Sequence, residues 1–115
     1  MDRNDLIAKE KRVTEQLAQV QKDLKTIQER QETLTQLSKD GQRFFQDTLG
    51  LLGGSSDYPI FQGLYDEQVS LDKKVKIDIE REQDELQQDY SRLSAQFEEL
   101  AAARRQLDKE ETNGY

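Results

Sequence analysis

The sequence predicts an all-α protein, an antiparallel two-helix hairpin with coiled-coil-like packing. Two long, charged segments carry apolar residues at alternating steps of three and four, the spacing of a coiled-coil seam. Between them, residues 43–66 hold most of the aromatic residues, a Gly-Gly pair and the only proline. Apolar residues make up only 33% of the chain, which suits a thin seam between helices better than a thick core. We expect one helical-hairpin domain over residues 1–115, with helix 1 at about 4–52, a bend at 53–58, helix 2 at about 59–110 and a frayed tail at 111–115.

The first charged segment has a regular seven-residue repeat. Its a and d positions, which face a partner helix, are apolar except for Glu10 and Gln31. Polar residues in a seam cost stability but can fix register and partner choice; a tolerated, solvated gap is the open alternative. Asp2 or Asn4 is placed to cap the helix. The apolar members are Leu6, Val13, Val20, Ile27 and Leu34 at d, and Leu17 and Leu24 at a.

The repeat weakens as this segment approaches the bend. Ser38 and Gly41 occupy the next a and d positions, and we expect Leu37, Phe44 and Phe45 to lie off the earlier seam. A glycine in a helix interior costs about 1 kcal/mol relative to alanine, so this part of the helix should be weak without ending there. We expect the helix to end at the Gly-Gly pair, where a left-handed cap is sterically free.

A second helix is expected to start directly after the bend. Residues 55–57 offer three N-cap candidates, and Pro59 then lies in the first turn, where its missing N–H does no harm. The apolar stripe of this helix contains one four-residue step, a stutter, just before Ile79. Its members are Leu64, Leu71 and Val75 before the stutter, then Ile79, Leu86, Leu93, Leu100 and Leu107 at d, with Tyr90 and Phe97 at a and the polar exceptions Gln83 and Arg104.

The register of the two helices stays open at this level. In an antiparallel pair the a layers of one helix should meet the d layers of the other. One alignment that satisfies this rule places Leu24 opposite Leu86, a second is shifted by one heptad, and both fold the chain back within residues 55–58. A third alignment pairs polar with polar and places Glu10 opposite Arg104.

Charge and composition narrow the function classes. The net charge is −7 and the pI about 4.7, so the chain repels phosphate backbones and we expect no nucleic-acid partner. The densest basic patch, Lys73, Lys74, Lys76 and Arg81, is interleaved with acidic residues, which favours a solvated helix face over a phosphate or lipid site. No run approaches the ~20 apolar residues of a membrane span. We expect no membrane insertion, and a cytoplasmic location or co-export with a client without a cleaved signal peptide.

The residue types that carry most enzyme chemistry are missing. The chain has no cysteine and no histidine, which removes thiolate chemistry, an imidazole base and zinc sites of the usual ligand types. Adjacent acids such as Glu98 and Glu99 lie on a charged helix with no apolar pocket to separate their pKa values. We therefore expect no catalytic residues, no metal and no cofactor, and a protein that is not an enzyme.

The aromatic bend is the candidate functional site. Under one interpretation its large side chains pack against each other and close the hairpin tip. Under the other, a two-helix tip cannot cover them all, and the exposed remainder binds a partner protein. The candidate partner-binding residues are Phe44, Phe45, Leu49, Leu52, Tyr58, Phe61 and Tyr65.

Three stretches carry a family resemblance. They are Arg43-Phe44-Phe45 with the Pro59 bend, Glu80-Arg81-Glu82-Gln83-Asp84-Glu85-Leu86, and Ala103-Arg104-Arg105-Gln106-Leu107. In this pattern the chain resembles the small α-helical proteins associated with LXG toxins, which are related in layout to the WXG-type hairpins of type VII secretion. Phe61-Gln62-Gly63 lies near the bend, where the WXG-type proteins carry Trp-x-Gly.

The resemblance implies a function that the residues alone do not. It implies a chaperone and targeting factor that binds the helical N-terminal domain of an LXG polymorphic toxin for type VIIb secretion in Gram-positive bacteria. A second small helical protein is a further expected partner, and a hetero-oligomer is favoured over a homodimer. The alternative is a structural coiled-coil stalk or escort protein of a flagellar or injectisome export apparatus, which would self-associate or bind an ATPase ring.

Overall fold

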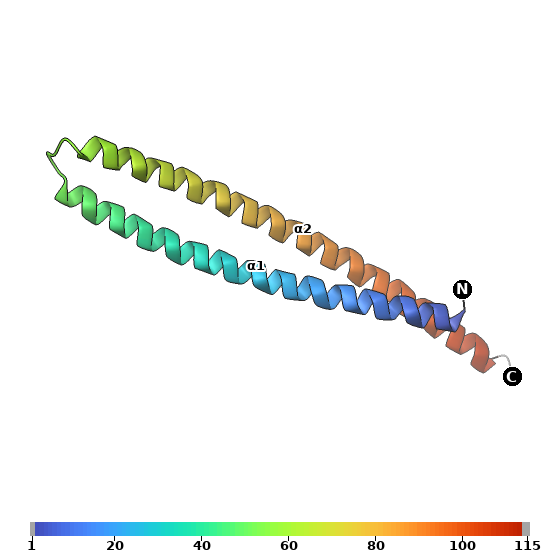
Figure 1. Ribbon diagram of the computed structural model, residues 1–115. Helices are drawn as coiled ribbons and strands as arrows, with labels where there is room; N and C mark the ends of the chain where they lie inside the picture. The colour runs from blue at the N-terminus through green and yellow to red at the C-terminus, as the bar shows by residue number, and fades with distance from the viewer. Residues whose placement is uncertain (1, 114–115) are drawn as a thin grey trace. The chain divides into compact units, whose positions relative to one another are not determined.

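The protein consists of two antiparallel α-helices and the loop that joins them (Figure 1). The computed structural model describes residues 2–113, with α1 at Arg3–Leu51, α2 at Tyr58–Asn113 and the loop at 52–57. No strand occurs within the described residues. The all-α hairpin predicted from the heptads is confirmed.

Helix α1 is capped at both ends by the expected residue types. At its start, the backbone N of Asp5 donates to Oδ1 of Asp2 over 2.8 Å, so Asp2 is the N-cap. After its end, Gly54 adopts a φ of 81°, the left-handed conformation that only glycine enters without steric cost. The backbone N of Ser55 donates to the carbonyl of Leu52 over 2.9 Å and closes the turn.

Helix α2 begins one residue before its predicted start. Tyr58, expected in the bend, is its first residue. Two hydrogen bonds lie at this start: the backbone N of Asp57 donates to Oγ of Ser55 over 3.1 Å, and the backbone N of Phe61 donates to the carbonyl of Asp57 over 3.1 Å. The second contact is the first i to i+4 bond of the new helix.

The expected frayed tail is wrong for residues 111–113, because α2 continues to Asn113. The hydroxyl of Thr112 donates to the carbonyl of Asp108 over 2.8 Å, and the carboxylate of Glu111 lies 3.4 Å from the guanidinium of Arg3 on α1. These contacts hold a turn whose sequence has no apolar periodicity. The other two residues of the predicted tail lie outside the described residues.

Contacts within the chain divide the single predicted domain into two compact units, each with part of both helices. The terminal unit comprises Met1–Lys25 and Asp84–Tyr115, and the bend unit comprises Thr26–Gln83. In an antiparallel helix pair each residue contacts only its own level of the seam, so contacts are local along the pair.

The terminal unit has the apolar seam that its heptads predict. Val13, Val20 and Leu93 are buried at its centre, with exposed fractions of 4–9%. Burying a side chain of this size contributes roughly 1.5–3 kcal/mol, so this seam is the main apolar stabilisation of the unit. The half-buried residues packed around it all come from the predicted a and d positions: Leu17, Leu24, Leu86, Tyr90, Phe97 and Leu100.

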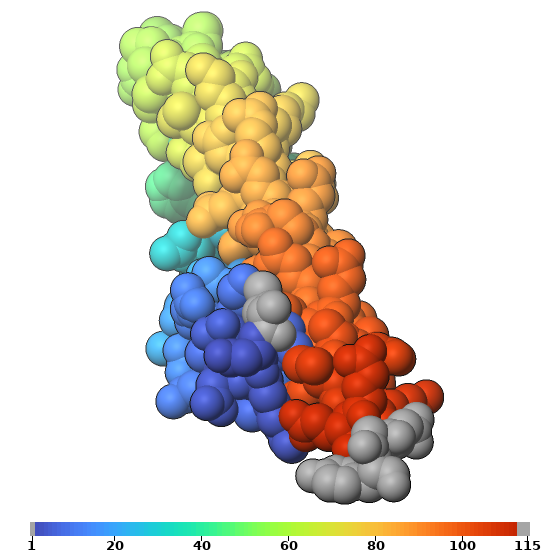
Figure 2. Space-filling model, turned by 90° about the vertical axis from the view of Figure 1, so that its right-hand side faces the viewer, coloured from blue at the N-terminus to red at the C-terminus, as the bar shows by residue number. Residues whose placement is uncertain are grey.

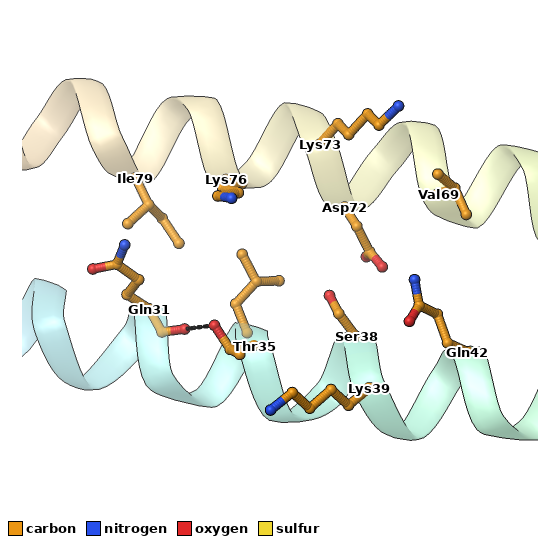
Figure 3. A pocket seen from close by; sticks show the side chains of 11 residues that line it. Gln31, Thr35, Ser38, Lys39, Gln42, Val69, Asp72, Lys73, Lys76 and Ile79 are labelled. Carbon is orange, nitrogen blue, oxygen red and sulfur yellow. Dashed lines mark hydrogen bonds between the residues drawn. The ribbon is translucent and has the colours of Figure 1, made fainter.

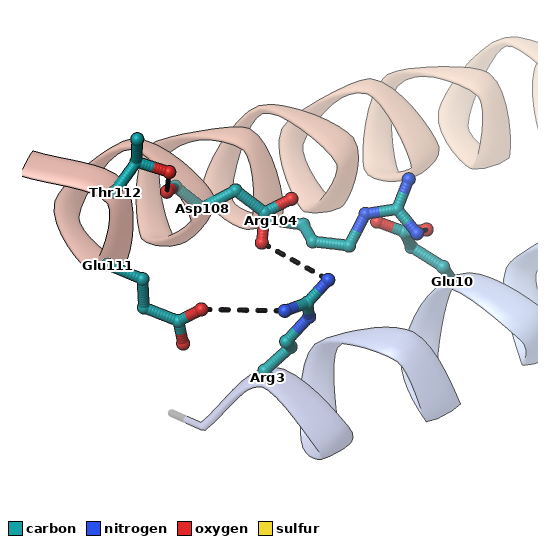
Figure 4. Close-up of polar contacts among 6 residues, drawn as sticks. All are labelled: Arg3, Glu10, Arg104, Asp108, Glu111 and Thr112. Atoms are coloured by element: carbon teal, nitrogen blue, oxygen red, sulfur yellow. Dashed lines mark hydrogen bonds and ion pairs between the residues drawn. The ribbon is translucent and has the colours of Figure 1, made fainter.

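Ion pairs cross between the helices of the terminal unit (Figure 4). Arg3 lies 3.4 Å from Asp108 and 3.4 Å from Glu111. Arg104 lies 3.0 Å from Glu10, whose side chain is almost buried. Figure 2 shows the first residues of α1, in blue, against the last turns of α2, in red. The contact pairs the two polar seam positions, as in the third of the alignments that the sequence left open.

The bend unit departs from the predicted seam. Seven-residue steps back from Ile79 lead to Asp72 and Tyr65, and both are half-buried. The heptad of α2 therefore runs on without a phase change, and the stutter expected before Ile79 is wrong. The three apolar residues expected to begin the stripe lie instead outside the seam, with exposed fractions of 44–55%; they are Leu64, Leu71 and Val75.

Candidate partner-binding surface

Four aromatic rings from both helices form a cluster next to the loop. Phe45 of α1 is at its centre, with ring centroids 5.6 Å from Phe61 and 5.4 Å from Tyr65, both on α2. Phe44 adds a ring 5.6 Å from Phe45 and 6.3 Å from Phe61. Edge and tilted ring pairs at these distances are worth roughly 0.5–1.5 kcal/mol each beyond their burial. The cluster therefore ties α1 to α2 within the bend unit.

The structure separates the predicted site residues into two groups. Phe44 and Tyr58 are exposed, with exposed fractions of 59% and 38%. The other five are half-buried near the loop: Phe45, Leu49, Leu52, Phe61 and Tyr65. The half-buried group fits the interpretation of a packed hairpin tip, and the exposed pair has surface to offer a partner.

Further exposed apolar residues extend this surface beyond the predicted site. On α1, Leu37 and Leu51 lie seven residues on either side of Phe44, with exposed fractions of 63% and 87%. Residues seven apart share one side of a helix, so the three form a stripe. The seven-residue spacing of these three residues can be read from the sequence. Whether their side chains are exposed depends on which residues fill the seam between the helices.

A second stripe runs along α2 and joins the first. Leu64 and Leu71 are seven residues apart, and Val75 lies four residues further on the same side. The ring contact between Phe44 and Phe61 connects the α1 stripe to the neighbouring side of α2. We call the two stripes together the apolar face; it comprises Leu37, Phe44, Leu51, Leu64, Leu71 and Val75.

Small and polar residues occupy the seam beneath this face. Ser38, Gly41 and Asp72 are half-buried between the helices, while Leu37 and Leu71 are exposed. The seam of the terminal unit contains a larger share of apolar residues. Because burying apolar area is worth about 25 cal/mol per Å², the isolated bend unit forgoes stabilisation that a covered apolar face would supply.

A groove lies between α1 and α2 in the bend unit (Figure 3). Its volume is about 300 Å³. In Figure 3, Ile79 and Gln31 lie at one end, Val69 and Gln42 lie toward the other, and Asp72 points toward α1. The lining also includes Leu34, Thr35, Ser38, Lys39, Lys73 and Lys76.

Residues 2–113 contain no group of three or more His, Cys, Asp or Glu side chains arranged to hold a metal ion. Neither described helix has a stretch long and apolar enough to cross a membrane. The ring cluster, the apolar face and the groove are the surface features of the bend unit.

The fold and these surfaces define a class, the charged antiparallel helical hairpin with an apolar surface on its bend half. The chain belongs to the DUF3958 family, described as a protein of unknown function, whose family model matches residues 3–107. Neither a curated protein nor a solved structure matches the chain.

Proposed function

We propose that this protein is a non-enzymatic partner of the helical N-terminal domain of an LXG polymorphic toxin, acting as its chaperone and targeting factor for type VIIb secretion. The observation that carries the proposal is the apolar face, which leaves six large apolar side chains exposed on one unit. Contiguous apolar surface of this kind marks interaction sites in soluble proteins.

The spacing of the apolar face favours an α-helical partner. Leu37, Phe44 and Leu51 repeat every seven residues, as do Leu64 and Leu71. An amphipathic helix presents apolar residues at steps of three and four, so it can lie along such a stripe with its own seam facing inward. The long helices of a toxin's N-terminal domain would supply this surface.

The family resemblance suggests an LXG toxin as the client, and the exposed apolar stripes support a helical partner. The pattern around Phe44-Phe45, Pro59 and Arg104-Arg105 resembles the LXG-associated helical proteins. In this function the chain meets its client in the cytoplasm, covers apolar helix surface before export, and either stays behind or leaves with the client.

The test is co-expression with the N-terminal domain of an LXG toxin encoded beside this gene. The two chains should co-purify in stoichiometric amounts. Leu71→Glu should abolish the complex without changing helicity, because a carboxylate would be buried in an apolar contact. The matched control is Ile7→Glu on the terminal unit, where Ile7 is also exposed, at 42%.

Three outcomes would count against the proposal. A chain that stays monomeric beside the toxin domain has no such client. A chain that self-associates, or binds an export ATPase instead, is the structural stalk or escort protein. Equal binding of the toxin domain by the Leu71→Glu and Ile7→Glu variants would show that the apolar face does not contact the toxin.

A further inference from the structure

We propose that the groove between α1 and α2 in the bend unit docks an acidic amphipathic helix. The inference rests on the proposed function in one respect, that the docked helix belongs to the same helical partner. It assigns that partner a charge and a second contact, separate from the apolar face.

The groove is long enough for a short helix and has apolar side chains along it. On α1 its lining runs from Gln31 to Gln42, which is roughly 16 Å, or three turns, at 1.5 Å per residue. Leu34, Val69 and Ile79 provide apolar contacts along it. A free inorganic anion gains nothing from contact with these apolar side chains, whereas the apolar side of a short helix can pack against them.

The charge of the groove comes from both helices. Lys39 of α1 and Lys73 and Lys76 of α2 line it, against one carboxylate, Asp72, an excess of two positive charges. None of the three lysines takes part in the ion pairs found across residues 2–113. In a chain of net charge −7, a groove with three lysines that form no ion pair is a local inversion of sign.

This arrangement changes the interpretation of the basic patch in the sequence. Lys73, Lys74 and Lys76 alternate with acids along α2 and alone favoured a solvated face. The structure adds Lys39 from the other helix and leaves Lys74 outside the lining. In Figure 3, the side chain of Lys73 points away from α1 and that of Lys39 lies along α1, and both residues belong to the groove lining. A carboxylate entering with a helix would be met from two sides.

Other anionic macromolecules fit less well. A bilayer surface is flat and cannot follow a groove between two helices, and the net charge of −7 repels extended anionic surfaces such as lipid bilayers and nucleic acids, within a Debye length of about 8 Å. In the neutral polar lining, the hydroxyl of Ser38 can donate to a carboxylate, whereas the hydroxyl of Thr35 already donates to the carbonyl of Gln31 over 2.9 Å. The favoured ligand is therefore an acidic helix of a protein.

The test uses the full chain and two stapled helical peptides. The peptides share one apolar stripe and differ only at its flanking positions, which are Glu in one and Lys in the other. The acidic peptide should bind about tenfold tighter or more at low ionic strength, and the difference should shrink with added salt. Lys39→Gln with Lys73→Gln and Lys76→Gln should remove the preference, and the three Lys→Glu changes should invert it.

The matched control carries three lysine changes outside the groove, at Lys11, Lys25 and Lys109, all exposed. It alters net charge by the same amount and should keep the preference for the acidic peptide. Circular dichroism checks that each variant keeps its helicity. Binding to neither peptide, equal binding to both, or loss of the preference in the control would each overturn the proposal. Binding to anionic phosphatidylglycerol vesicles instead of the acidic peptide would replace it by a membrane contact.

The two proposals fail separately. If the toxin domain does not co-purify but the peptide preference holds, the proposed function is wrong and the groove remains. If the toxin domain binds the groove variants as tightly as the native chain, the groove is not a partner site and the proposed function remains.

Discussion

Glu10 on α1 and Arg104 on α2 form a cross-helix ion pair, with Arg104 Nη1 3.0 Å from Glu10 Oε2. Glu10 is 8% exposed, and its other carboxylate oxygen, Oε1, is buried without a hydrogen-bond partner. Both residues occupy a positions, and the neighbouring a and d positions of the terminal unit are apolar. An alignment that left either residue facing apolar residues would bury a charge without a partner of opposite sign. The ion pair therefore favours one register in the terminal unit.

Removing the arginine should therefore destabilise the hairpin. Arg104→Ala leaves the Glu10 carboxylate in the seam without its cation. Since the arginine side chain is 39% exposed, solvent moderates the loss, and we expect about 1–3 kcal/mol in the free energy of unfolding. Urea denaturation followed by circular dichroism measures it.

The control for this prediction is Arg105→Ala, at the exposed neighbouring position, with a change within about 0.5 kcal/mol. The double variant Glu10→Leu with Arg104→Leu should be as stable as the native chain or more so, because apolar pairs often replace buried ion pairs without loss. Equal destabilisation by Arg104→Ala and Arg105→Ala would show that the ion pair does not stabilise the fold.

Two leucines of α2 should differ sharply in their effect on stability. Leu93 is 4% exposed and packs with Val13 and Val20. Leu93→Ala should cost about 2–5 kcal/mol, through lost burial and a cavity. Leu71 is 55% exposed, and Leu71→Ala should stay within about 0.5 kcal/mol. The same urea titration compares them, and similar losses at both positions would contradict the burial pattern.

The loop offers a test of backbone conformation at adjacent glycines. Gly54 has a φ of 81°, so Gly54→Ala forces a side chain into the left-handed region and should cost about 1–2 kcal/mol. Gly53 has no positive φ, and an added Cβ would meet the carbonyl oxygen of Gly50 at 3.7 Å, an ordinary contact. Gly53→Ala should therefore cost much less. A thermal melt of both variants would refute the assignment if their order were reversed.

The tip residues should separate by function. Phe45 is half-buried among three other rings, and Phe45→Ala should lower the free energy of unfolding by about 1–2 kcal/mol. Leu51 is 87% exposed, and Leu51→Ala should leave stability within about 0.5 kcal/mol. Under the proposed function Leu51→Ala weakens toxin-domain binding in a pull-down. If Phe45→Ala left stability unchanged, the ring cluster would not be part of the hairpin tip.

Several features of the fold follow from local sequence. The heptads around Val13 and Leu93 predict the terminal seam because a helix repeats every 3.6 residues and its faces can be counted. Asp2 and Gly54 mark helix ends for reasons contained in one or two residues, a side-chain acceptor and freedom at positive φ. By contrast, the continuation of α2 to Asn113 depends in part on Arg3, which no local pattern contains.

The sequence by itself thus determined two helices, the place of the bend and the composition of the terminal seam. Only the tertiary structure decided that Glu10 meets Arg104, that Leu64, Leu71 and Val75 face outward, and that Lys39 joins Lys73 and Lys76 in one groove. The physical reason is the same in each case. Helix formation and periodicity are properties of neighbouring residues, whereas register across two helices depends on contacts between residues far apart in the chain.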